Sequence, residues 1–185
     1  MKFFKFIIII FISLQTSIKA DLNKDLLSKL QDGGKLIFIR HAYAPGSGDP
    51  QNFNLNDCST QRNLSAEGEK QAREIGKFFK KNKIVIDKVL SSQWCRCKET
   101  SKLAFKTFKV KNFLNSFYSP KFYNNKKKQM KNLKNFVKNW NSNKNLVLVT
   151  HYVVIHETLD YAPSSGEIVI SDKKFNLIGS LKINP

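Results

Sequence analysis

A short apolar block that ends in Arg40 and His41 is the feature that most constrains how this chain can fold. Residues 36–39, LIFI, are an uninterrupted run of strand formers. A run without polar alternation is typical of a strand buried on both faces of a parallel sheet. A loop rich in Gly, Pro and Asp follows. Arg40 and His41 are therefore predicted at the carboxyl end of the strand, where open α/β sheets bind ligands.

A second block of the same kind, NLVLVT over residues 145–150, ends in His151. One such histidine would more often be structural, but Arg40 and Arg96 also lie at element boundaries. If the two strands are neighbours, all four side chains converge on one crevice. Arginine offers paired donors to phosphate oxygens, and a neutral imidazole can attack phosphorus. This composition favours phosphoryl transfer without a metal or any other cofactor.

Helices and strands alternate along the rest of the chain. Spacing and capping predict helices over residues 21–31, 65–81, 94–105, around 130–140 and 152–159. Apolar runs predict further strands over residues 84–90, 110–117, 167–170 and 176–183, the last two as a hairpin across 172–174. This order predicts a three-layer α/β/α sandwich with a largely parallel central sheet.

The first twenty residues have the pattern of an export signal. Lys2 and Lys5 precede an apolar core over residues 6–14, and Ala20 is a small residue suited to cleavage. The core is shorter than the roughly 20 residues that a membrane span needs, so a cleaved signal is favoured over an uncleaved anchor. We expect a signal peptide over residues 1–20, a single domain over 21–185, and an exported protein, periplasmic or secreted.

The formal charge of +18 favours anionic partners. The excess is mostly lysine mixed with asparagine, and the lysines near residues 126–138 are expected to form a solvated face. No arginine-rich block points to nucleic acid. The expected partners are a phosphorylated small molecule, a phosphorylated envelope component or a phosphoprotein.

The three cysteines are Cys58, Cys95 and Cys97. In an exported protein, Cys58 can pair with either of the other two, which leaves one thiol over. Such a bond would pin the loop after His41 to the helix that presents Arg96. The spacing of the cysteines does not suit zinc.

Four motifs together resemble the histidine phosphatase superfamily. They are Arg40-His41-Ala42, Leu64-Ser65-x-x-Gly68-x-x-Gln71-Ala72, Ser91-Ser92-x-x-x-Arg96-x-x-x-Thr100 and Thr150-His151. The resemblance is closest to the small phosphohistidine-phosphatase-like and phosphoglycerate mutase-like branch, in an exported version, and it implies a phosphoglycerate mutase-like fold. It also implies that His41 takes the phosphoryl group, while Arg40, Arg96 and His151 hold the phosphate. Arg62 is a further candidate for substrate contact, or else a surface arginine.

Two departures leave the proton donor for the leaving group open. Tyr152 stands directly after His151, where the acidic branch has an aspartate, and residues 114–117 lack the acid of the mutase-like branch. Asp49, Asp57 and Glu157 are candidates by position, although a structural role is favoured for each. Because a good leaving group needs little help from an acid, an activated substrate such as a phosphohistidine or acyl phosphate is favoured.

Three alternatives to a phosphomonoesterase remain open. The same arginines and histidines would serve a non-catalytic phosphate-binding module equally well. A mutase is disfavoured by the missing acid and by export. A basic surface protein that adheres to anionic envelope polymers would bind in a salt-dependent manner without needing His41.

Overall fold

The computed structural model describes residues 24–184, so the expected signal peptide lies outside the described residues. Within them, a six-stranded sheet has the order β3-β2-β4-β1-β5-β6. The strands are β1 (Leu36–Arg40), β2 (Ile86–Ser91), β3 (Lys109–Val110), β4 (Asn145–Thr150), β5 (Ile168–Ser171) and β6 (Leu177–Leu181). The strands from β3 to β1 are parallel, and β5 runs antiparallel to both β1 and β6.

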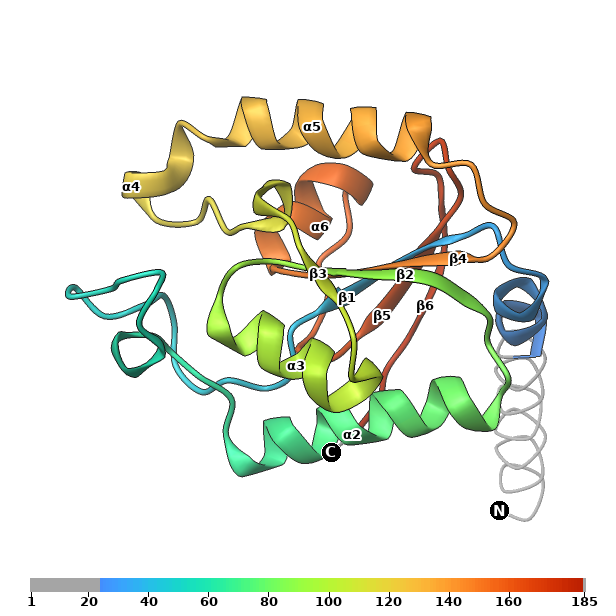
Figure 1. Cartoon of the computed structure of the whole chain (residues 1–185), viewed down its shortest axis with the longest axis horizontal. Coiled ribbons are helices and arrows are strands. Elements are labelled where there is room, and N and C mark those ends of the chain that lie inside the picture. Colours follow the sequence, from blue (N-terminus) through green and yellow to red (C-terminus); the bar gives the residue numbers. More distant parts are fainter. Residues whose placement is uncertain (1–23, 185) are drawn as a thin grey trace, which may run out of the picture.

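Helices cover both faces of the sheet (Figure 1). They are α2 (Ala66–Lys81), α3 (Cys95–Phe105), α4 (Pro120–Tyr123), α5 (Lys126–Asn139) and α6 (Tyr152–Leu159), with a further helix over residues 24–32 and short 3-10 turns at Cys58–Thr60 and Asn112–Leu114. In Figure 1, α2 and α3 lie below the sheet, whereas α5 and α6 lie above it. The predicted three-layer α/β/α sandwich with a largely parallel sheet is confirmed.

Alternate residues of the central strands build two separate cores. Leu36 and Phe38 of β1 belong to the core under α5 and α6, while Ile37 and Ile39 belong to the core under α2 and α3. All four side chains are fully buried. This burial on both faces explains why the strand reads as an unbroken apolar run.

The start of α2 follows from its sequence. The side chain of Ser65 accepts a hydrogen bond from the backbone N–H of Gly68, as an N-cap should. A Cβ on Gly68 would lie 1.9 Å from the backbone oxygen of Tyr43, and one on Gly76 would lie 2.4 Å from that of Ala104. The small residues of α2 therefore bring it close to the loop after β1 and to α3.

One predicted strand is wrong. Residues 110–117 form a strand only at Val110, and the chain then turns through the 3-10 segment Asn112–Leu114. Phe113, Leu114 and Phe117 are buried in the core above the sheet. Their apolar character therefore reflects packing of an irregular segment and not strand pairing.

None of the described helices combines the length and apolarity needed to cross a bilayer.

Candidate active site

The two histidines that follow β1 and β4 lie side by side. Arg40 pairs in register with Thr150, and the backbone N–H of His41 donates to the oxygen of Thr150 at 2.9 Å. The imidazole rings of His41 and His151 meet edge to face, with centroids 5.6 Å apart. Both side chains are almost fully buried, at 3% exposure. The condition set by the sequence, that the two strands be neighbours, is met.

The tautomer of His41 follows from its hydrogen bond. Its Nδ1 lies 2.8 Å from the backbone oxygen of Ala42. A carbonyl only accepts, so Nδ1 carries the proton and the lone pair lies on Nε2. Burial, together with the guanidinium of Arg96, holds the pKa of His41 well below its usual value. His41 is therefore a neutral imidazole with a nucleophilic Nε2 near neutral pH.

A chain of hydrogen bonds that ends at Nε2 of His151 orients this imidazole. The backbone N–H of Gln93 donates to Oδ1 of Asn115 at 2.9 Å, and the hydroxyl of Ser92 donates to the same oxygen at 3.1 Å. The Ser92 oxygen then accepts from Nε2 of His151 at 2.8 Å. This leaves Nδ1 as the nitrogen that can face a ligand, and burial lowers the pKa of His151 well below its usual value.

The two arginines share one pattern of contacts. Arg40 donates through Nη1 to the backbone oxygen of Pro163 at 2.9 Å, and Arg96 donates through both Nη atoms to Asp49. In each, Nε is buried and has no acceptor among the described residues. The Nε edge of a guanidinium matches two oxygens of a phosphate. Each arginine is thus held through its terminal nitrogens, and its Nε–H is a donor without an acceptor among the described residues.

These groups lie in a cavity of about 390 Å³ at the carboxyl ends of the strands. Arg40, His41, Arg96 and His151 form its floor, and Arg62 lines it as well. Its walls come from the loop after β1, from the connection between β3 and α4, and from the starts of α3, α4 and α6. No cluster of His, Cys, Asp and Glu among residues 24–184 could hold a metal ion. The arrangement can bind a tetrahedral oxyanion directly beside a nucleophile.

Residues 36–115, which include Arg40, His41 and Arg96, match the family model for the histidine phosphatase superfamily, branch 1. The match to this superfamily covers fewer than half of the 185 residues. No curated protein sequence matches it.

Solved structures share the fold of this chain. The protein histidine phosphatase SixA in complex with tungstate is 15% identical, with a TM-score of 0.53 over 82% of this chain and 97% of that one. A putative phosphohistidine phosphatase SixA from Agrobacterium tumefaciens is 18% identical, with a TM-score of 0.53 over 80% and 98%. A phosphoglycerate mutase from Thermus thermophilus is 16% identical, with a TM-score of 0.52 over 81% and 99%.

Of the three acids considered from the sequence, one lies in the cavity. Asp49 accepts from Arg96, from the indole N–H of Trp94 at 2.9 Å and from the backbone N–H of Arg62. Burial raises the pKa of Asp49, but these donors, Arg96 above all, outweigh it and lower the pKa, so Asp49 is ionised and both its oxygens are engaged. Asp57 caps the 3-10 turn at Cys58–Thr60, and Glu157 pairs with Lys126 at 2.7 Å on the surface. All three have structural contacts.

Arg62 lies at the edge of the cavity and mainly fastens the loop after β1. Its Nε donates to the backbone oxygen of Gly48 at 2.7 Å, and its Nη1 donates to that of Ala44. Its own backbone oxygen accepts from Arg96 at 3.3 Å. Arg62 therefore holds the loop beside the anion site. It is neither a free surface arginine nor a side chain committed to the substrate, the two roles that the sequence left open.

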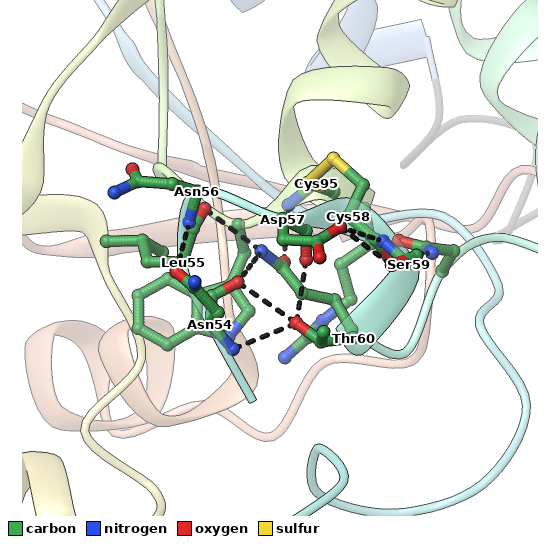
Figure 2. Close-up of a disulfide and its surroundings, with 12 residues drawn as sticks. Asn54, Leu55, Asn56, Asp57, Cys58, Ser59, Thr60 and Cys95 are labelled. Atoms are coloured by element: carbon green, nitrogen blue, oxygen red, sulfur yellow. Dashed lines mark hydrogen bonds between the residues drawn. A yellow bond between two sulfur atoms is a disulfide. The ribbon is translucent and has the colours of Figure 1, made fainter. Parts of the chain in front are cut away.

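Of the two disulfides left open by the sequence, the structure contains Cys58–Cys95, with Cα atoms 5.7 Å apart (Figure 2). The bond ties the loop after β1 to the first residue of α3, one position before Arg96. Cys97 is free and buried, with Sγ 3.5 Å from Nε2 of His151. Burial raises the pKa of its thiol to about 12, so Cys97 is protonated and not a nucleophile.

Sequence reasoning missed the polar chain behind His151 and the aromatic wall of the cavity. Ser92 was part of a recognised motif, but its bond to His151 depends on strand pairing. Asn115 lies in the segment that was wrongly predicted as a strand. Trp94, Phe53 and Phe122 come from three separate segments, and no periodicity in the sequence links them.

Proposed function

We propose that this chain is an exported phosphomonoesterase that works through a phosphohistidine on His41. The observation that carries the proposal is the neutral His41, with its lone pair on Nε2, beside the buried Nε donors of Arg40 and Arg96. A nucleophile next to unused cationic donors suits attack on a phosphoryl group. Binding of tungstate, an oxyanion, by the SixA neighbour supports the same site chemistry.

The reaction has two steps. Nε2 of His41 forms a bond to phosphorus while the bond from phosphorus to the leaving oxygen breaks with its electron pair. A water molecule then attacks phosphorus, the P–N bond breaks, and inorganic phosphate leaves. Nδ1 of His151 accepts the proton of a phosphate monoanion and shares it with an equatorial oxygen as charge develops there. Arg40 and Arg96 hold the other oxygens.

The leaving group departs without a dedicated acid, because Asp49 is ionised and bound to Arg96. We infer that the substrate is activated, such as an acyl phosphate or a phosphohistidine, since these leave as weak bases. Two structural neighbours that carry the name SixA favour the phosphohistidine class. Asn115 and Ser116 occupy the mid-chain position where a mutase would carry an acid, which disfavours transfer between hydroxyl groups.

The experiment is hydrolysis of acetyl phosphate by the mature chain and two histidine variants. His41→Ala is expected to lower kcat by about a thousandfold or more, as loss of a nucleophile does. His156→Ala is the matched control, because His156 is half-exposed on α6 and does not line the cavity. A folded His41→Ala protein that keeps wild-type turnover would overturn the proposal.

A further inference from the structure

The cavity is larger than the phosphoryl group that its floor holds. Its volume of about 390 Å³ falls in the range of sites for small molecules, about 300–1000 Å³. The cationic floor takes the phosphate, so the outer part of the cavity is left for the leaving group. The residues of that outer part therefore determine which substrates fit.

Aromatic rings form a fixed wall of the outer cavity. Phe53 stacks on Trp94 with centroids 5.2 Å apart, and Phe122 meets both rings edge to face at 5.7 and 5.5 Å. Trp94 is only 2% exposed, and its indole N–H is held by Asp49. The three rings come from the loop after β1, the start of α3 and α4. In Figure 1 that loop and α4 lie at the same end of the molecule.

Two tyrosines that line the cavity are exposed to water. Tyr118, which precedes α4, is 65% exposed, and Tyr152 at the start of α6 is 37% exposed. Both line the same cavity as the aromatic wall. The guanidinium of Arg40 lies 5.8 Å from the ring centre of Tyr152, which connects this tyrosine with the anion site. Because the ring of Tyr118 is exposed to water, stacking on a flat ligand would bury part of its apolar surface and stabilise the complex.

The charges of the cavity exclude a cationic leaving group. Among the described residues, Asp49 is the one carboxylate that lines it, and its oxygens are taken by Arg96 and Trp94. Lys121 adds a further positive charge to the lining. A neutral or anionic group is therefore favoured beyond the phosphate.

We propose that the outer cavity, defined by Phe53, Trp94, Phe122, Tyr118 and Tyr152, is a subsite for a flat, uncharged or anionic aromatic ring on the leaving group. The inference rests on the proposed function for the placement of the phosphate, and it narrows the substrate to phosphorylated aromatic compounds. Aromatic faces prefer flat rings over saturated ones of the same size, because stacking adds to the burial of area.

Binding of phosphonates by titration calorimetry tests the subsite without requiring hydrolysis. Benzylphosphonate is expected to bind the wild-type chain about tenfold more tightly than methylphosphonate, a difference of about 1.4 kcal/mol. Cyclohexylmethylphosphonate is similar in size to benzylphosphonate but is not flat. Its gain in affinity over methylphosphonate is expected to be clearly smaller. Affinities of all three ligands within twofold of one another would overturn the proposal.

Two tyrosine variants separate the subsite from the general surface. Tyr118→Ala is expected to reduce the preference for benzylphosphonate about three- to fivefold. Tyr123→Ala is the matched control, since Tyr123 is 59% exposed on the neighbouring α4 but does not line this cavity. An equal loss in both variants, or no loss in Tyr118→Ala, would contradict the assignment.

Turnover of benzoyl and acetyl phosphate links the subsite to catalysis. Their leaving acids are of similar strength, so a difference in kcat/KM reports on binding of the ring. The wild-type chain is expected to favour benzoyl phosphate about tenfold. Hydrolysis of neither compound, with the calorimetric preference intact, would refute the proposed function and not the subsite. Turnover of both at equal kcat/KM would refute the subsite and not the function.

Discussion

Asp49 accepts hydrogen bonds from both terminal nitrogens of Arg96, at 2.7 Å from Nη1 and 3.2 Å from Nη2. The side chain of Arg96 is 4% exposed and that of Asp49 is 17% exposed, so the ion pair is largely shielded from water. The carboxylate thus fixes the guanidinium through its terminal nitrogens and leaves Nε without an acceptor among the described residues. It also draws the loop after β1 onto the start of α3.

Asp49→Asn is expected to lower both activity and stability. Without the carboxylate, Arg96 becomes a buried charge with a poor partner, which costs about 3–5 kcal/mol in the free energy of unfolding. The loosened guanidinium should also raise KM for acetyl phosphate. Asp57→Asn is the control from the same loop, because asparagine caps the 3-10 turn as well as aspartate does. Urea titration and steady-state kinetics measure both effects, and similar results for the two variants would contradict this role.

Ser92→Ala is expected to reduce kcat about tenfold with a smaller change in KM. The hydroxyl of Ser92 accepts from Nε2 of His151, so its loss releases the imidazole from the tautomer that presents Nδ1 to the substrate. Ser91→Ala is the control, because Ser91 is equally buried and donates only to the backbone oxygen of Ser92. A comparable fall in kcat for both variants would reduce Ser92 to a packing role.

The sequence predicts the layers, the central strands and the four charged or imidazole groups of the floor. It does so because β1 and β4 are buried on both faces and read as apolar runs that end in polar residues. It cannot predict the contacts of Asp49 or Asn115, because these side chains lie in irregular segments whose paths depend on packing elsewhere. Phe113 and Leu114 are a second example, because a buried 3-10 turn and a buried strand both require apolar residues and their sequences look alike.

Loss of the Cys58–Cys95 disulfide is expected to free the loop that carries Asp49 and Arg62. Closing a loop of 37 residues contributes about 4 kcal/mol in the chain-entropy model. A reductant should therefore lower both the melting temperature and the turnover of acetyl phosphate. The double variant Cys58→Ala/Cys95→Ala should begin at the lowered values and should not respond to reductant. A wild-type chain whose activity is unaffected by complete reduction would show that the loop is held by its other contacts.

The stability of the chain is expected to fall as the pH drops below about 6.5. In the folded state the pKa values of His41 and His151 are depressed by burial and by Arg96, whereas in the unfolded state they return to about 6.5. Below that pH the unfolded chain binds more protons, so each histidine removes up to about 1.4 kcal/mol per pH unit until its folded pKa is reached. Above it, neither contributes.

Urea unfolding between pH 5 and 8 measures this dependence. His151→Gln is expected to show a shallower loss of unfolding free energy below pH 6.5 than the wild-type chain. His156→Ala, which removes a half-exposed histidine, should keep the wild-type slope. Equal slopes in all three proteins would contradict the neutral, buried state of the pair.

Rapid acid-free quenching of the protein during turnover of labelled acetyl phosphate, followed by peptide mass spectrometry, tests the nucleophile most directly. We predict one phosphoryl group on the peptide that contains His41, stable in alkali and lost in acid as a phosphoramidate is. The group should be absent from His41→Ala and present in His156→Ala. Substrate turnover with no phosphorylated peptide, or with the label on another residue, would contradict the assignment of His41.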